Sequence, residues 1–261
     1  MGAALALDSA TTLFENEGYS HHIPTSYESA VMGRRILALT KLATLSTVFP
    51  DASPHAGTRE NRPTGLDGLP IGLMDYIGDC EEEGNPTILA IQIGTTFKNV
   101  RAGSNITVSL QWTPPYPPAK RISMLSRIAS YIPFLGDLSD SNKIPDTVPF
   151  SAANLPRFSL IGHLESIHPD EQTSKDLAQC YTSKHPDSKY WLPGNRIHTS
   201  EWVRMVVNHV YWIGGFGDRA YIGWIPTEEW KNVTRAEWED IKLPGETKDW
   251  NEWNADESVE L

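Results

Sequence analysis

Two threonines and a lysine lie close together in the segment Gly94–Val100, which reads Gly-Thr-Thr-Phe-Lys-Asn-Val. The segment follows a strand-like run and opens a predicted helical turn. A helix start attracts anions because its first backbone N–H groups lack partners and face the positive end of the helix dipole. Lysine adds a charge-assisted hydrogen bond. Thr95, Thr96 and Lys98 therefore indicate a phosphate site, although an ordinary polar strand-to-helix connection has a similar composition.

Several predicted strands surround this segment. Thr87–Ile93 precedes it and Asn105–Trp112 follows it, and both are rich in β-branched residues. Upstream, Leu42–Val48 alternates apolar and hydroxyl residues with period two, which predicts a half-buried strand. Leu69–Ile77 predicts a further strand. Before all of these, Thr25-Ser-Tyr-Glu28 forms a capping box, which predicts a helix that ends near the first strand.

The second half of the chain predicts three more strands and one long helix. The strands are expected at Arg157–Glu165, Trp202–Ile213 and Arg219–Ile225, and the last two are joined by a glycine-rich turn. Asp170 caps a helix that runs to about Lys184. Strands that are mostly neighbours in sequence, with few helices between them, favour an antiparallel barrel over a doubly wound sheet.

Composition suggests the domain boundaries. We expect residues 1–24 to be a flexible N-terminal segment and residues 25–240 to form a single domain. An insertion at residues 113–155 begins with four closely spaced prolines and contains an amphipathic helix near residues 124–132. The insertion would pack on the barrel or cover a site. Residues 241–261 form an acidic tail, which is typical of a solvated segment.

Charge and motifs exclude several classes of function. The chain has 22 basic and 33 acidic residues, a net charge of -11, which argues against binding a nucleic-acid backbone. No run of 18 apolar residues is present, so we predict no membrane span. Gly215–Ala220 matches a dinucleotide fingerprint, but a strand follows it where that fingerprint needs a helix. His163-Leu-Glu165 lacks the cysteine pair of zinc deaminases. No metal site is predicted, and no catalytic residue can be assigned.

The expected cellular compartment rests on weaker signals. Cys80 and Cys180 permit one disulfide or two thiols, and Cys180 falls within a predicted helix, where a buried inert thiol is the default. Two sequons, at Asn105 and Asn232, matter only if the chain enters the secretory pathway. The start of the chain lacks a basic segment, and Asp8 interrupts its apolar run, so it makes a poor secretory signal. We expect a cytoplasmic location, with a secretory or endolysosomal location as the alternative.

The order of the segments resembles that of the FMN-binding split-barrel superfamily, whose best-known enzyme is pyridoxamine 5′-phosphate oxidase. The similar segments are Arg34-Arg-Ile-Leu, Ala43–Val48, Gly68-Leu-Pro-Ile, Thr95–Val100 and Val108-Ser-Leu110. Later segments resemble the CREG-like branch, most closely its fungal members: Arg157–Gly162, Lys184–Asp187, Val210–Asp218 and Pro226–Thr234. The resemblance covers about residues 26–240.

This resemblance implies a mainly β fold, a six-stranded antiparallel split β-barrel that works as a homodimer with flavin sites in the grooves between subunits. It implies that Thr95, Thr96 and Lys98 hold the phosphate of FMN, with Asn99 adjacent. The oxidases usually place arginine and lysine together at this phosphate, whereas Lys98 has only Arg101 as support.

Two functions are consistent with the resemblance. The first is a flavin-linked oxidation or reduction of a small organic substrate, in which FMN carries the chemistry. The alternative, from the CREG-like branch, is a non-enzymatic secreted or endolysosomal glycoprotein. Its flavin groove is blocked and it acts by binding other proteins. The sequence does not identify a substrate.

Overall fold

The computed structural model describes residues 22–51, 62–116, 151–217 and 219–248. The helix expected near residues 124–132 lies outside them. The described residues belong to two compact units. The larger unit comprises the described residues up to Trp112 and Pro156–Asp240, and the smaller one contains residues 113–116, 151–155 and 241–248. In the smaller unit, the Tyr116 backbone N–H donates to the Gly245 carbonyl over 3.1 Å.

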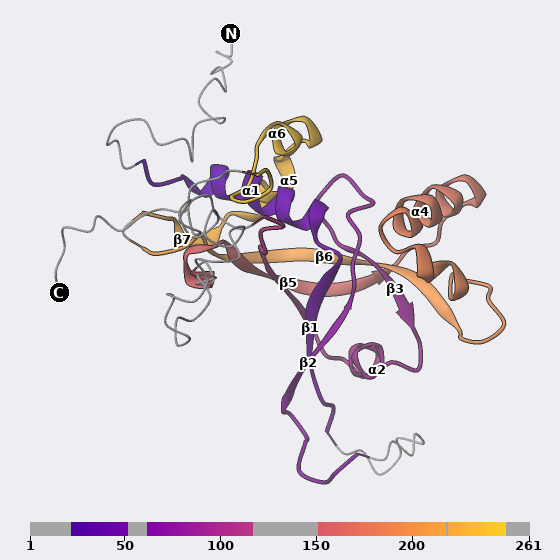
Figure 1. Ribbon diagram of the computed structural model, residues 1–261. Helices are drawn as coiled ribbons and strands as arrows, with labels where there is room; N and C mark the ends of the chain where they lie inside the picture. Colours follow the sequence, from indigo (N-terminus) through magenta and orange to yellow (C-terminus); the bar gives the residue numbers. More distant parts are fainter. Residues whose placement is uncertain (1–21, 52–61, 117–150, 218, 249–261) are drawn as a thin grey trace, which may run out of the picture. The chain divides into compact units, whose positions relative to one another are not determined.

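Seven strands in the described part of the larger unit form one antiparallel sheet (Figure 1). Six strands follow the order β2-β1-β4-β5-β6-β3, and β7 pairs with β6 off this path. The strands are β1 (Leu42–Val48), β2 (Pro70–Tyr76), β3 (Thr87–Ile91), β4 (Ile106–Gln111), β5 (Arg157–Ser166), β6 (Ser200–Ile213) and β7 (Ile222–Ile225). The prediction of a mainly β, antiparallel split-barrel fold is confirmed.

Four strands are shorter than the sequence predicts. β2 and β4 lose one residue at each end, whereas β3 and β7 lose two and three residues at one end, and backbone turns explain these two larger differences. β3 ends at Ile91 because the Gly94 N–H donates to the Ile91 carbonyl over 2.9 Å and begins a turn. β7 begins at Ile222 because the Gly214 N–H donates to the Tyr221 carbonyl over 2.9 Å. The turn after β6 therefore takes up residues that the sequence assigns to the strand.

The larger unit also contains the helices α1 (Ser26–Leu39), α2 (Thr95–Arg101), α4 (Glu171–Lys184), α5 (Thr227–Asn232) and α6 (Arg235–Asp240) and the 3₁₀ helix η4 (Pro186–Tyr190). The smaller unit contains the 3₁₀ helix η3 (Ala152–Asn154). Both halves of the predicted capping box at Thr25 and Glu28 are present. Asp170 caps α4 by accepting from the Thr173 N–H over 2.7 Å. None of the described helices combines the length and the hydropathy that a membrane span requires.

Aromatic rings form the core beneath α1. The Phe158 ring lies 5.4 Å from that of Trp212 and 5.7 Å from that of Trp230, centroid to centroid, and all three side chains are buried. Gly33 lets α1 approach these rings, since a Cβ at this position would lie 2.7 Å from the Trp230 ring. Figure 1 shows α1, α5 and α6 gathered beside one another, and α4 near β3.

Arg34 joins this helical layer to the connection between β2 and β3. Its guanidinium is 1% exposed and donates to the Trp230 and Val233 carbonyls, both over 3.2 Å, and to the Glu82 carbonyl over 2.5 Å. Burial lowers the pKa of Arg34. A buried charge is tolerated only where hydrogen bonds replace its hydration. The three carbonyls do so for the two terminal nitrogens, whereas Nε is buried without a partner.

Gly162→Ala tests the close approach of β5 and β6. A register shift occurs between Ile161 and Gly162, and a Cβ at Gly162 would collide with the Val206 carbonyl oxygen. We expect this substitution to reduce the free energy of unfolding by about 1–3 kcal/mol, because overpacking forces the backbone to shift. Urea denaturation measures the loss. Gly217→Ala is the control, since its added Cβ would meet only Ile222 at 3.5 Å; equal stability of both variants would contradict the packing described here.

Candidate functional site

Helix α2 carries all four residues that the sequence assigns to FMN. It follows β3 directly, and Gly94 is its N-cap residue. Asn99 is 1% exposed, and its side-chain amide donates to the Thr47 hydroxyl on β1 over 3.0 Å. Thr96 is 4% exposed. These two polar side chains therefore face the barrel and help to fix α2 on β1.

The predicted site is divided between two faces of α2. Residues three apart in a helix share a face, so Thr95 lies with Lys98 and Thr96 lies with Asn99. The first pair is half-buried, with access to solvent, whereas the second pair is buried. Arg101, which the sequence offers as support for Lys98, donates through a terminal guanidinium nitrogen to the Gln92 carbonyl at the end of β3.

Within one subunit these residues do not fit the phosphate of FMN. A phosphate needs several donors directed at one point, yet Asn99 already donates to Thr47 and only Thr95 and Lys98 share the accessible face. The cavity beside α2 measures about 140 Å³, below the usual range for cofactor sites. The role of Thr95, Thr96, Lys98 and Asn99 in FMN binding stays a prediction, and no flavin-dependent step is derived from them.

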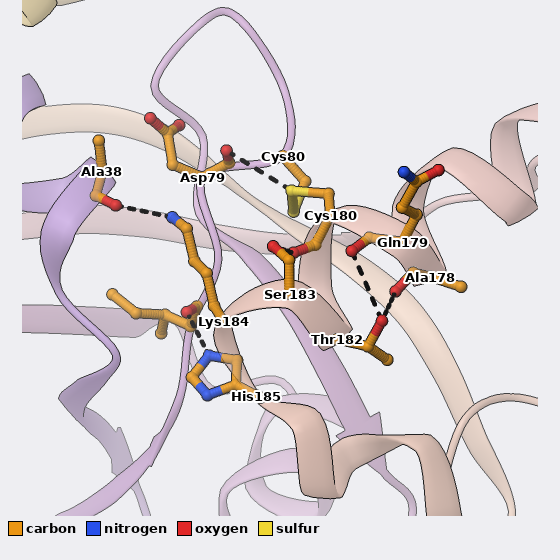
Figure 2. Close-up of a disulfide and its surroundings, with 11 residues drawn as sticks. Ala38, Asp79, Cys80, Ala178, Gln179, Cys180, Thr182, Ser183, Lys184 and His185 are labelled. Atoms are coloured by element: carbon orange, nitrogen blue, oxygen red, sulfur yellow. Dashed lines mark hydrogen bonds between the residues drawn. A yellow bond between two sulfur atoms is a disulfide. The ribbon is translucent and has the colours of Figure 1, made fainter.

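A disulfide joins Cys80, in the connection between β2 and β3, to Cys180 on α4 (Figure 2). The two residues are 100 positions apart in sequence, and their Cα atoms are 5.9 Å apart. The default expectation of a buried inert thiol at Cys180 is therefore wrong. α4 packs with its last two turns against this connection, which brings the sulfurs together. A sequence with two widely separated cysteines holds no signal that could choose between a bridge and two thiols.

The connection between β2 and β3 is held at several further points. Arg204 on β6 forms a two-point ion pair with Glu81, with N–O distances of 2.7 and 3.0 Å. The Trp230 indole N–H donates to the Gly84 carbonyl over 3.1 Å, and the Asn85 side-chain oxygen accepts from the Val207 N–H over 3.0 Å. Bidentate pairing of this kind fixes geometry as well as charge. The connection is therefore a rigid attachment point for α4.

The C-terminal end of α4 is anchored next to the disulfide. The Tyr181 hydroxyl donates to the Tyr76 carbonyl over 3.0 Å. Figure 2 shows the Lys184 ammonium donating to the Ala38 carbonyl, over 2.8 Å. His185 Nε2 lies 2.9 Å from the Ile77 carbonyl, so that nitrogen carries the proton. The His185 ring also stacks on Tyr76 at 4.3 Å. Burial lowers the pKa of His185, which favours the neutral ring.

Both sequon asparagines are exposed. Asn105 directly precedes β4, and Asn232 is the last residue of α5. The Thr234 hydroxyl of the second sequon donates to Glu237 over 2.7 Å at the start of α6. The surface therefore leaves room for a glycan at either position. Among the described residues, no group of three histidine, cysteine, aspartate or glutamate side chains is arranged to hold a metal ion.

The antiparallel sheet and its strand order define a protein of the split-barrel class. The family model described as "CREG, beta-barrel" matches residues 24–232, which is most of the 261-residue chain. The chain therefore belongs to the CREG β-barrel family. No curated protein matches the sequence significantly.

Solved structures with a similar fold include a heme binding protein from Mycobacterium smegmatis. It shares 16% identity, the alignment covers 80% of this chain and 61% of that one, and the TM-score is 0.49. A protein of unknown function from Agrobacterium tumefaciens shares 18% identity over 85% of this chain and 64% of that one, with a TM-score of 0.45. This chain thus spans less than two thirds of either protein's length. An F420 reductase shares 14% identity over 71% of this chain and 97% of that one, with a TM-score of 0.36. The family assignment rests on the family model.

Asp79→Asn tests the charged cluster beside the disulfide. Burial raises the pKa of Asp79, and the positive charges of Arg34 and Lys184 offset only part of that effect. One carboxylate oxygen, Oδ1, is buried without a hydrogen-bond partner. A group whose pKa is raised in the folded state stabilises the fold at acid pH and loses that contribution as pH rises through its folded pKa. The stability of Asp79→Asn relative to the unchanged protein should therefore increase from about pH 4 to about pH 7.

Differential scanning calorimetry across this pH range measures the effect. Asp176→Asn is the matched control, because Asp176 is exposed on α4 and makes only a local hydrogen bond to Gln172. If the stabilities of Asp79→Asn and of the unchanged protein changed with pH in parallel, burial of Asp79 would not govern the pH dependence of stability.

Proposed function

We propose that this protein is a disulfide-stabilised, glycosylated homodimer of the secretory or endolysosomal pathway that acts by binding other proteins. The Cys80–Cys180 bridge is the observation that carries this proposal. Disulfides persist in oxidising compartments and are rare in the cytosol, where thiol systems keep cysteines reduced. The bridge therefore favours the secretory alternative over the cytoplasmic location expected from the start of the sequence.

Two features of α2 favour a binding role over flavin chemistry. The buried Asn99 and Thr96 secure the helix to β1 and do not face solvent. The accessible pair, Thr95 and Lys98, provides one cationic side chain where a phosphate dianion is held best by several donors. Two residues of the predicted cofactor site are therefore used for packing. This arrangement is consistent with a CREG-like protein whose flavin groove is blocked.

The homodimer is supported by the exposed apolar surface of β2. This strand lies at the end of the strand order and pairs with β1 along its length. Leu73 is 41% exposed and Met74 is 69% exposed. An edge strand that presents large apolar side chains to water is a favourable surface for association. A second copy of the chain would remove this surface from water.

An FMN-dependent oxidoreductase acting on a small organic substrate is the second candidate function. Thr95 and Lys98 share one accessible face of α2, so a groove completed by a partner subunit would receive a hydroxyl and an ammonium group from this chain. In that case FMN would supply the hydride or electron transfer. Binding of this kind requires donors beyond the two on this face.

Expression of the full chain in eukaryotic cells distinguishes the two candidates. We expect the protein to enter the secretory pathway, to lose mass on treatment with peptide N-glycosidase, and to lack flavin absorbance near about 450 nm. Asn105→Gln and Asn232→Gln should each remove the glycan at that position. Asn208→Gln is the control, since Asn208 is exposed but lies outside any sequon. An unglycosylated cytosolic protein that retains flavin would overturn the proposal and favour the oxidoreductase.

A further inference from the structure

A small cavity lies between α2 and one face of the sheet. Its volume is about 140 Å³, and strands β3, β5 and β6 line it opposite the helix. The register of the paired strands explains why residues from β3, β5 and β6 line the same cavity. Ala90 pairs with Glu201, and Ser166 pairs with Val203. Directly paired residues point to the same face of a sheet, as do residues two apart in one strand.

The volume of the cavity suits a small apolar group. Phe97, Leu164 and Val203 are among the apolar side chains that line it. An apolar cavity of about 150 Å³ accommodates a benzene molecule. The cavity therefore suits a branched alkyl group or a single aromatic ring, and it is too small for a flavin or a haem.

Glu201 places an acidic group beside these apolar walls. Its side-chain Oε2 accepts a hydrogen bond from the Ser166 hydroxyl over 3.1 Å. Among the residues that the structure describes, Glu201 forms no ion pair with a lysine, arginine or histidine. The carboxylate is half-buried and retains acceptor capacity. A ligand ammonium group would provide the missing positive partner.

Arg101 places a basic group at the same cavity. Its guanidinium donates to the Gln92 carbonyl, and a guanidinium has five N–H donors in total. Within the described residues Arg101 has no carboxylate partner within ion-pair distance. Its side chain is exposed, so the remaining donors are available to a ligand carboxylate.

We propose that this cavity binds a small zwitterion with an apolar side chain, namely a free α-amino acid whose side chain is branched or aromatic. The apolar walls take the side chain, Glu201 takes the ammonium group and Arg101 takes the carboxylate. A ligand with one charge would satisfy only one of the two groups. Arg101 lies three residues after Lys98 on α2, so the cavity adjoins the accessible face that carries Thr95 and Lys98, and Glu201 and Arg101 are its charged lining residues.

Isothermal titration calorimetry of the full chain with four probes tests this proposal. L-leucine should bind with a millimolar or lower dissociation constant. 4-Methylpentanoate lacks the ammonium group, isoamylamine lacks the carboxylate and glycine lacks the apolar side chain. Each should bind at least about tenfold more weakly, which corresponds to the loss of one charge-assisted or apolar contact.

Variants assign each charge to its partner. Glu201→Gln should abolish the preference for leucine over 4-methylpentanoate, and Arg101→Gln should abolish the preference for leucine over isoamylamine. Lys231→Gln and Glu165→Gln are matched controls, because they remove the same charges from exposed positions on α5 and β5 that do not line the cavity. Both controls should bind leucine like the unchanged protein. No detectable leucine binding, equal binding of glycine, or equal effects of control and cavity variants would overturn the proposal.

Discussion

A covalent bond between segments 100 residues apart is the constraint on which much of this structure depends. It fixes α4 against the connection between β2 and β3, and the same connection is held from the other side by Arg34 and Arg204. In the chain-entropy account, a bridge that closes about 100 residues stabilises a fold by on the order of 5 kcal/mol. That amount is comparable to the whole stability of many domains. Reduction of this bond would therefore remove a contribution of that size.

In α2, two of the four residues that the sequence assigns to a cofactor are buried against the barrel. The helix is seven residues long and follows β3 after a turn of three residues, so one of its faces must cover the barrel. Thr96, Phe97 and Asn99 lie on that face. Asn99 remains satisfied because Thr47 accepts its hydrogen bond.

Local sequence signals predict most of the fold. The capping box at Thr25 and the cap at Asp170 mark the starts of α1 and α4, because these side chains satisfy nearby backbone donors. The alternation in Leu42–Val48 marks β1 with its observed bounds. Strand ends are harder to predict, since the turn bond from Gly94 to Ile91 depends on the backbone conformation of the folded chain.

The candidate site is less predictable, because it depends on contacts between distant segments. Residue types identify Thr95, Thr96, Lys98 and Asn99 as polar, but only the docking of α2 on β1 shows which two of them are buried. The pairing of Cys80 with Cys180 depends on how α4 packs. The cavity beside Glu201 depends on the register of three strands. None of these relations leaves a local pattern in the sequence.

Native mass spectrometry of the protein purified from eukaryotic cells under non-reducing conditions tests the central claim most directly. One spectrum reports subunit number, the oxidation state of the two cysteines and any retained cofactor. The account predicts a dimer of oxidised, glycan-bearing subunits with no flavin. Subunits with two free thiols and one bound FMN each would contradict it.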